Sequence, residues 1–328
     1  MTTNISEKII LESTVPEELA GHRLDQVLAK LFPEHSRSRL QRWLKARYVS
    51  LNGEICLNNK DKVHGGETIT IHAELEIETP WQGEEIPLQI LYEDDALLII
   101  NKPVGLVVHP GAGNHEGTLV NALLHHAPEL ALVPRAGVVH RLDKDTSGVL
   151  VVARTPTAHT QLVSQLQERE FYREYEAIVQ GELTAGGTVD APIGRHPTKR
   201  LQMAVVERGK PAITHYRVLE RFSGYTRVTV KLESGRTHQI RVHMAHIHYP
   251  LLGDPTYGPR LRFPKQASPE LQEALRGFRR QALHAKKLGL HHPLTGDYME
   301  WEAPVPRDLL EMIELLRQVK LVVPHRPG

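Results

Sequence analysis

The sequence has one cysteine, Cys56, in 328 residues. A single thiol excludes an internal disulfide and a cysteine-rich zinc site. The sequence also lacks any apolar run near the ~18–20 residues of a membrane span, and Met1–Glu12 has polar and acidic residues where a signal peptide needs an apolar core. These absences favour a protein of the reducing cytoplasm that has no membrane partner.

Acidic residues are missing from 35–53, although the whole chain has 39 aspartates and glutamates against 40 lysines and arginines. This stretch carries cations instead, at Arg37, Arg39, Arg42, Lys45 and Arg47. A net charge of +1 does not by itself indicate a nucleic-acid partner, so the local excess of cations is the informative feature. We expect these side chains to contact nucleic-acid phosphates, with a solvated helix face as the alternative.

The length allows one large and one small domain, because single cores stop growing at ~250–300 residues. Hydrophobic residues make up 40% and charged residues 24%, which is ordinary for folded domains. An acidic, proline-containing stretch before residue 88 is typical of a linker. We therefore expect an N-terminal extension at 1–16, a small domain at 17–75, a linker at 76–87, a large domain at 88–320 and a tail at 321–328.

Apolar spacing in the small domain predicts two helices and a small sheet. The first helix ends before Pro33 and has apolar residues at i, i+3, i+4 and i+7, which are Leu24, Val27, Leu28 and Leu31. The second begins near Ser36 and buries Leu40, Trp43 and Leu44. Asn52-Gly53 predicts a tight hairpin turn. This pattern resembles the RNA-binding domain named after small-subunit ribosomal protein four, the S4-like domain.

The large domain mixes apolar strand-like runs with helical patterns. The strands are expected at 96–100, 149–153 and 226–232, and helices at 158–169 and 307–316. This mixture predicts an α+β fold with a core built on a sheet.

The segment 137–148 carries the strongest chemical signal. It places five ionisable side chains in the six positions from His140 to Asp145 and then enters the apolar run 149–152. A charged turn next to a buried strand places carboxylates at the edge of a core, where neighbouring cations and burial set their pKa values. Such turns are common catalytic positions.

His140 to Gly148, read as His-Arg-Leu-Asp-Lys-Asp-Thr-Ser-Gly, resembles the signature of the pseudouridine synthase family that includes enzymes of the large ribosomal subunit. Segments 101–110, 173–181 and 235–243 resemble the same family, in its order. The resemblance implies a mixed, largely antiparallel catalytic sheet. It makes Asp143 the catalytic aspartate, Tyr175 an active-site strand residue, and Arg241 an active-site arginine on a further strand. Arg141 would fill the space of an extruded base.

The subgroup that carries an S4-like appendage implies a substrate in the large-subunit (23S) ribosomal RNA, in the stem-loop called helix 69. We accordingly expect large-subunit ribosomal RNA or a pre-50S particle as partner, and a monomer. Isomerising uridine involves no oxidation or hydrolysis, so no cofactor and no metal are expected. The loop with Arg195, Lys199 and Arg200 is a further candidate for phosphate contacts, although solvated loop charge explains it equally well.

Three other readings fit less well. A metal-dependent hydrolase could use His238, His243, His246 and His248, but the His-Glu-x-x-His pairing is absent and Arg236 and Arg241 would lie beside the metal. A kinase would need a glycine-rich phosphate loop before 140–143. A non-catalytic RNA-binding or ribosome-assembly protein would not need the set of Arg141, Asp143, Tyr175 and Arg241. We assign no catalytic role to His140, His238 or His243.

Overall fold

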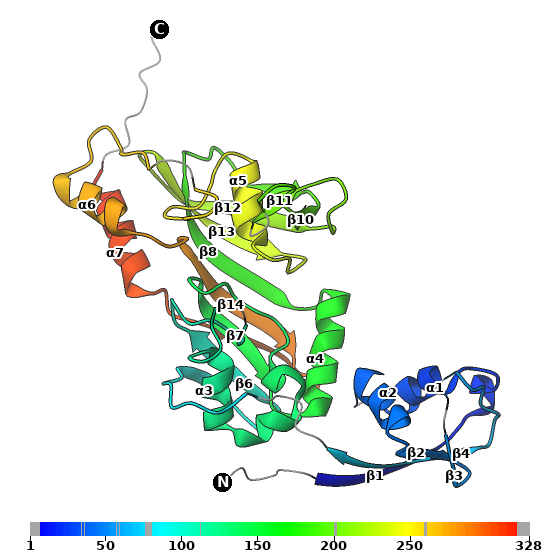
Figure 1. Cartoon of the computed structure of the whole chain (residues 1–328). Helices are drawn as coiled ribbons and strands as arrows, with labels where there is room; N and C mark the ends of the chain where they lie inside the picture. Colours follow the sequence, from blue (N-terminus) through cyan, green and yellow to red (C-terminus); the bar gives the residue numbers. More distant parts are fainter. Residues whose placement is uncertain are drawn as a thin grey trace.

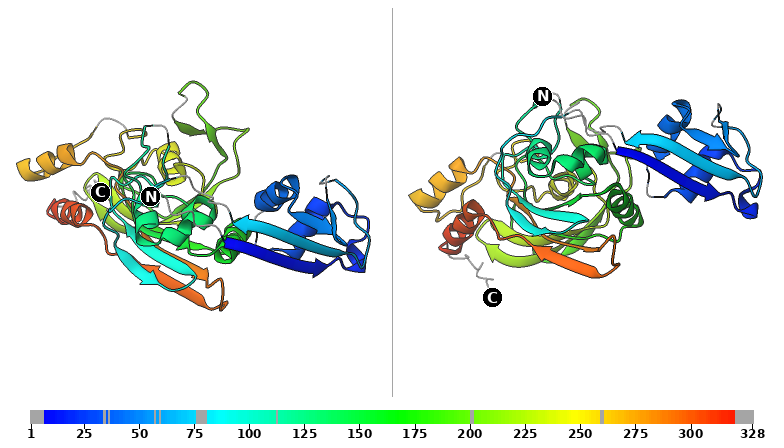
Figure 2. Two further views of the ribbon diagram at one scale, coloured as in Figure 1. Left: turned by 60° about the horizontal axis from the view of Figure 1, so that its bottom comes forward. Right: turned by 90° about the horizontal axis from the view of Figure 1, so that it is seen from below.

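The computed structural model describes residues 7–33, 35, 37–56, 58, 60–75, 81–111, 113–199, 202–258 and 261–319. They form a small N-terminal domain and a large domain, which lie side by side with the small domain at one end of the large one (Figures 1 and 2). Within the described residues, no helix is long and apolar enough to cross a membrane. The expected tail at 321–328 falls outside this description.

The small domain has two helices packed on a sheet, as predicted. Its sheet has the order β1-β4-β2-β3 and is antiparallel throughout. Its elements are β1 (Glu7–Thr14), η1 (Glu17–Leu19), α1 (Leu24–Leu31), α2 (Arg37–Lys45), β2 (Val49–Leu51), β3 (Glu54–Ile55) and β4 (Thr68–Leu75). The apolar residues that predicted the helices form its core with Val49, Ile69 and Ile71. The S4-like arrangement thus follows from the apolar spacing.

The expected domain boundaries need correction. β1 pairs with β4 along its whole length, from Glu7 opposite Leu75 to Thr14 opposite Thr68, so this part of the expected extension belongs to the small sheet. The described part of the expected linker is bound to the large domain, because Asn121 donates to the Gln82 carbonyl at 2.8 Å and Glu84 accepts from the Gly117 amide. These partners are distant in sequence, which is why composition alone misplaced both boundaries.

The large domain is built on a sheet in the order β5-β6-β7-β14-β8-β13-β12-β9, with β15 beside β14. Neighbouring strands are antiparallel except β7 and β14. The predicted α+β fold with a mixed, largely antiparallel sheet is therefore confirmed. The strands are β5 (Ile90–Glu93), β6 (Leu97–Lys102), β7 (Ser147–Ala153), β8 (Tyr172–Gln180), β9 (Gly187–Asp190), β12 (Ile213–Phe222), β13 (Tyr225–Leu232), β14 (Leu283–His291) and β15 (Tyr298–Glu302).

Helices and a separate hairpin surround this sheet. The hairpin is β10 (Ile193–Arg195) with β11 (Met203–Val205). The helices are α3 (Leu119–His126), η2 (Pro128–Leu132), η3 (Pro134–Gly137), α4 (Pro156–Glu168), α5 (Gln239–His246), α6 (Pro269–Gly277) and α7 (Arg307–Arg317). The helices expected at 158–169 and 307–316 are confirmed as α4 and α7.

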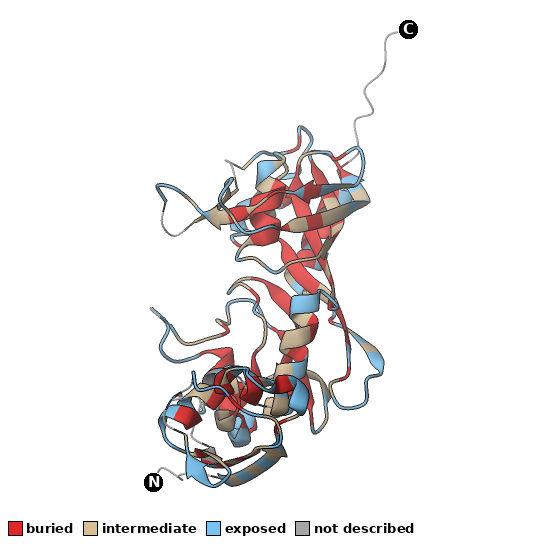
Figure 3. Ribbon diagram, turned by 90° about the vertical axis from the view of Figure 1, so that its right-hand side faces the viewer, coloured by how far each residue is buried: buried red, intermediate tan, exposed pale blue. Residues whose placement is uncertain are grey.

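β6 and β7 are buried on both faces, which explains their continuous apolar runs. Leu98, Ile100, Leu150 and Val152 join a cluster with α3, and the alternate residues Leu97, Ile99, Val149 and Val151 join a second cluster with Ala158 and Leu162 of α4. Figure 3 shows this buried centre of the large domain in red. The turn that enters β7 is therefore anchored to a rigid core.

Candidate active site

The turn before β7 holds Asp143 at the edge of this core. The Thr146 amide donates to the Asp143 carbonyl at 3.0 Å, and Gln281 donates to the Thr146 hydroxyl at 3.1 Å. Gly148 has a φ of 116°, and a Cβ there would lie 2.1 Å from the Ala285 carbonyl oxygen. Only glycine therefore allows β7 to approach β14 at this point, which fixes the end of the turn.

A fully buried lysine ties a second loop to the same turn. Lys102, at the end of β6, donates from Nζ to the carbonyls of Pro103, Leu106 and Lys144 at 2.7, 2.9 and 2.9 Å. Burial lowers the pKa of Lys102 to about 8, although Asp145 and Asp143 oppose this shift. The family resemblance includes segment 101–110, but it assigns no role to Lys102.

Arg241 contacts Asp143 from α5. Its Nη1 donates to Asp143 Oδ2 at 2.9 Å. Its other edge makes a bidentate pair with Asp254, through Nε to Oδ2 at 2.7 Å and Nη2 to Oδ1 at 2.9 Å. Asp254 therefore receives the bidentate pair, and Asp143 accepts a single hydrogen bond.

The position of Arg241 on a strand was also expected, and it is wrong. The segment Gln239–His246 is the helix α5. Ile240, Val242 and Met244 alternate along the sequence as they would in a strand, yet all residues from Gln239 to Met244 are buried. A helix buried on all sides shows no amphipathic period, so the sequence pattern could not distinguish it from a strand.

Burial and ion pairing oppose each other in the pair of Arg241 and Asp254. Burial raises the pKa of Asp254, but the Arg241 guanidinium and the amides of Thr256 and Tyr257 outweigh it and lower that pKa overall. Burial lowers the pKa of Arg241, and Asp254 and Asp143 together raise it above its usual value. Arg241 and Asp254 therefore both stay ionised at neutral pH.

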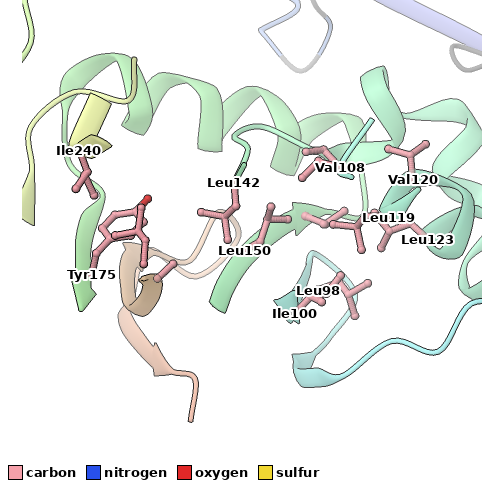
Figure 4. Close-up of a cluster of buried hydrophobic side chains, with 14 of the residues drawn as sticks. Leu98, Ile100, Val108, Leu119, Val120, Leu123, Leu142, Leu150, Tyr175 and Ile240 are labelled. Carbon is pink, nitrogen blue, oxygen red and sulfur yellow. The ribbon is translucent and has the colours of Figure 1, made fainter. Parts of the chain in front are cut away.

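Tyr175 lies on β8 and forms another wall of the site. It belongs to the hydrophobic cluster with Leu142 and Ile240, and Figure 4 shows its ring between them. Burial raises the pKa of Tyr175, Arg173 lowers it, and Asp143 raises it further. The phenol is therefore protonated at neutral pH.

A cavity of about 370 Å³ connects these side chains. Asp143, Tyr175 and Arg241, to which the family resemblance assigns roles in the site, line it together with Arg141. Its volume falls within the ~300–1,000 Å³ of small-molecule sites. A carboxylate, an aromatic ring and several cations thus surround a space that can hold one base.

The family of this chain follows from comparison with known proteins. A model of the RNA pseudouridylate synthase family matches residues 96–246, and an S4 domain model matches 22–69. Ribosomal large subunit pseudouridine synthase D of Escherichia coli K12 is 57% identical over 313 residues, which are 95% of this chain and 96% of that protein. The chain belongs to the RNA pseudouridylate synthase family.

Other pseudouridine synthases agree with this assignment. The synthase D of Pseudomonas aeruginosa is 57% identical over 314 residues, 96% of this chain and 98% of that protein. The solved structure of human RNA pseudouridylate synthase domain containing 4 covers 70% of this chain and 93% of its own, with 28% identity and a TM-score of 0.55. The predicted enzyme class, an isomerase that forms pseudouridine in RNA, is confirmed. The readings as hydrolase, kinase or non-catalytic protein are not supported.

The described histidines of this pseudouridine synthase do not converge on a metal site. Within the described ranges, no group of three or more histidine, cysteine or acidic residues is arranged to hold a metal. His243 contacts Thr214 and the Ala191 carbonyl with its two ring nitrogens, and His140 accepts from the Val151 amide. His238 differs, because its Nε2 lies 3.8 Å from Asp143 Oδ1 and its Nδ1 lies 2.8 Å from the Tyr257 hydroxyl.

The cations expected to bind RNA are not all at the surface. Arg37, Arg42, Lys45 and Arg47 are exposed. Arg39 is only 3% exposed and donates to the Leu132 carbonyl of the large domain at 2.7 Å, so its expected place on the outer face of α2 is wrong. A basic side chain at a domain contact cannot be distinguished by sequence from one that faces solvent. Arg195 and Lys199 are exposed, and Arg200 lies outside the described residues.

Proposed function

We propose that this pseudouridine synthase isomerises uridines of large-subunit (23S) ribosomal RNA, in the stem-loop of helix 69, with Asp143 as the reacting carboxylate. The substrate is supported by the 57% identity, over 95% of the chain, to an enzyme named for the large ribosomal subunit. The observation that carries the role of Asp143 is its pairing with Arg241 beside the cavity. With ribosomal RNA as substrate, the chain acts in the cytoplasm.

The geometry leaves one oxygen of Asp143 available for chemistry. Oδ2 accepts from Arg241, while Oδ1 has only His238 at 3.8 Å among the residues that the structure describes. Asp254 neutralises the other edge of Arg241, so the three groups together carry one negative charge. This arrangement places a fixed cation beside Asp143 without fixing both of its oxygens.

Two routes from this carboxylate to pseudouridine are open. In the first, Asp143 attacks the anomeric carbon and displaces the base. In the second, it removes a proton from the adjacent sugar carbon and the base leaves to give a glycal. In both, the base turns and C5 bonds to the anomeric carbon. This step releases the Asp143 carboxylate from that carbon on the first route, and on the second it is accompanied by return of the proton to the adjacent sugar carbon. The C5 proton is then lost. Neither route consumes an oxidant, a nucleotide or a metal.

In this proposal Tyr175 and Arg141 act on the base and its place in the RNA stack, and neither reacts with the sugar. The Tyr175 ring lies in the cavity wall and offers a flat surface on which the displaced uracil can stack, and its protonated phenol can relay the C5 proton. Arg141 is exposed at the cavity, two residues before Asp143. Its side chain is placed to enter the RNA stack when the uridine is extruded, which offsets an unstacking free energy of a few kcal/mol.

RNA contacts outside the cavity come from the small domain and the β10-β11 loop. The exposed cations Arg37, Arg42, Lys45 and Arg47, with Arg195 and Lys199, are proposed to contact phosphates of the ribosomal RNA or of a pre-50S particle. Asp143, Tyr175, Arg241 and Asp254 come from one chain, which supports a monomer as the active form.

The test uses large-subunit RNA from cells that lack this gene. Incubation with the wild-type protein should give pseudouridines in helix 69, detected by carbodiimide labelling and primer extension. Asp143→Asn should give none, while its RNA affinity stays within several-fold of wild type, because the amide keeps the shape of the site but cannot attack or deprotonate the sugar. Asp145→Asn, on the same turn but outside the cavity wall, is the matched control and should stay active. Modification by Asp143→Asn at the wild-type rate would contradict the proposal.

A further inference from the structure

Arg173 is a buried cation of the cavity wall. It lies on β8 two residues before Tyr175, so both side chains point to the same face of the sheet. Arg173 is 7% exposed and lines the cavity, and its Nε has no hydrogen-bond partner among the described residues. Within the described part of the chain, no carboxylate pairs with this guanidinium, in contrast to Arg241.

The surroundings of Arg173 are shaped for it but do not neutralise it. A Cβ at Gly235 would lie 2.8 Å from Arg173 Nη1, so glycine leaves room for the guanidinium. Burial and the positive charge of Arg173 together lower the pKa of the neighbouring His140 to about 3, so this imidazole is neutral. Asp143 is the one acidic residue among those that line the cavity, and Arg241 already holds it.

Such a cation lowers the stability of the fold. A guanidinium stays charged at neutral pH, and burying an unpaired charge is unfavourable unless a partner is supplied. Local violations of this kind are concentrated at functional sites. Arg173 is therefore placed for an anion that is present only when RNA is bound.

The reaction itself creates that anion. When the bond between N1 and the anomeric carbon breaks, its electron pair stays on the base, on the nucleophilic and on the glycal route alike. The resulting uracil anion spreads its charge over N1 and the two carbonyl oxygens. The charge disappears when C5 uses an electron pair to bond to the anomeric carbon.

We propose that Arg173 donates a hydrogen bond to a carbonyl oxygen of the uracil anion and stabilises the detached base. Side chains at i and i+2 of a strand are separated by about 7 Å, so a base stacked on Tyr175 has its edge within reach of Arg173. A backbone phosphate is the other anion in reach of the site. It fits the exposed Arg135 and Arg141 better than a side chain that is buried in the wall.

This inference rests on the proposed function, and single-turnover kinetics test it separately. The substrate is a helix 69 stem-loop RNA at saturating enzyme, with binding and melting temperature measured in parallel. Arg173→Met removes the charge and keeps a side chain of similar length. Arg173→Lys keeps the charge but lacks the planar set of N–H donors of the guanidinium. Arg227→Met is the control, because Arg227 lies on the adjacent strand β13 and pairs with Glu176 outside the cavity.

We expect Arg173→Met to lower the rate constant about 10²–10³-fold, the usual effect of removing one donor to a developing anion. Arg173→Lys should retain part of the rate, and Arg227→Met all of it. RNA affinity should stay within about threefold, since the anion forms only after binding. The melting temperature of Arg173→Met should be equal to or higher than that of wild type, since an unpaired buried charge is removed. A purely structural arginine would lower it.

RNA with 5-fluorouridine at the target gives a second readout. Fluorine withdraws electrons and makes the base a better leaving group, so Arg173→Met should lose less of the rate at which 5-fluorouridine disappears. Equal losses on both RNAs would overturn the proposal. So would weaker binding with an unchanged saturated rate and a smaller salt slope, which indicates a phosphate contact. If the wild type fails to convert the stem-loop, the proposed function fails. If it converts the RNA and Arg173→Met equals it, only the role of Arg173 fails.

Discussion

Basic side chains in the cavity and on the surface of α2 differ in burial and in pairing. Arg241 has 6% of its side chain exposed and is fixed by two carboxylates. Arg42 and Lys45 of α2 are exposed. A buried, paired guanidinium has one geometry and holds a reacting group in place. An exposed cation is flexible, and its interaction with phosphate is weakened by salt.

The difference teaches where each kind of effect should be measured. Charges in the cavity act on the rate constant and on stability, because they are buried and held by specific partners. Charges on α2 act on RNA affinity and its dependence on salt. The following variants test whether buried and exposed charges act on these different quantities. They begin with the variant expected to have the largest effect.

Asp254→Asn should have the largest effect on stability. The Asp254 side chain is fully buried, and its replacement leaves the Nε edge of Arg241 without its carboxylate. Breaking a buried pair in this way costs about 3–5 kcal/mol of the free energy of unfolding. We also expect a lower single-turnover rate, since Arg241 then moves relative to Asp143. Urea denaturation and tritium release from C5-labelled RNA measure the two effects.

The decrease in stability should depend on pH with a definite sign. Asp254 has a folded-state pKa below its usual value of 3.8, so its ionised form favours the folded state. The stability it provides is complete above the unfolded-state pKa and is lost as the pH falls through the folded-state pKa. The gap between wild type and Asp254→Asn should thus be constant from pH 5 to 7 and shrink below pH 3.8.

Asp308→Asn is the matched control for this prediction. Asp308 also binds an arginine, Arg280, with two hydrogen bonds of 2.6 and 2.9 Å, but 44% of its side chain is exposed. Its replacement should lower stability less than that of Asp254, because water can reach the carboxylate position even though Arg280 itself is buried, and it should leave the rate unchanged. Equal destabilisation by the two variants would mean that burial does not distinguish these pairs.

The sequence predicted those parts of the fold and site that depend on local pattern. The apolar pattern of 24–31 predicts one helix and that of 149–153 predicts one strand. The structure has both, as α1 and β7. Asp143 and Tyr175 were identified because their neighbours in sequence form a recognisable motif. Both line the cavity.

What the sequence missed depends on contacts between distant segments. Asp254 is a single acidic residue after an apolar pair, and only the fold brings it to Arg241. Lys102 gains its role from the carbonyl of Lys144, which is 42 positions away. Strand β1 is recognisable only with its partner β4. No local property of these residues carries such information.

Arg141→Ala should have an intermediate effect that depends on the RNA. Arg141 is exposed at the cavity, and no hydrogen bond or ion pair with a described residue holds its side chain. Its proposed insertion offsets unstacking of a few kcal/mol, so the variant should lose about 10–10²-fold in rate on a stem-loop. The effect should be smaller on an unpaired oligonucleotide. Single-turnover rates on the two RNAs give the comparison.

Lys144→Ala controls for changes in the turn, because Lys144 is exposed and does not line the cavity. It should be active on both RNAs. Equal fractional decreases in the rate of Arg141→Ala on the two substrates would instead favour a role in organising the turn or in the electrostatics of Asp143. In that case Arg141 would belong with Arg241 rather than with the RNA-contacting cations.

The smallest effect is expected from the exposed cations of α2, and Arg39 on the same helix provides the contrast. Replacing Arg42 and Lys45 by alanine should weaken RNA binding and reduce the log-log salt slope by about one for each phosphate that the protein no longer neutralises. The saturated rate should not change.

Arg39→Ala removes the donor to the Leu132 carbonyl, so it should lower stability where the two domains meet and leave the salt slope unchanged. Filter binding at salt concentrations between about 50 and 200 mM measures the slopes, and thermal unfolding measures stability. If Arg39→Ala lowers the slope as much as the double variant, Arg39 reaches RNA in the complex, and the division between buried and exposed cations does not hold where the domains meet.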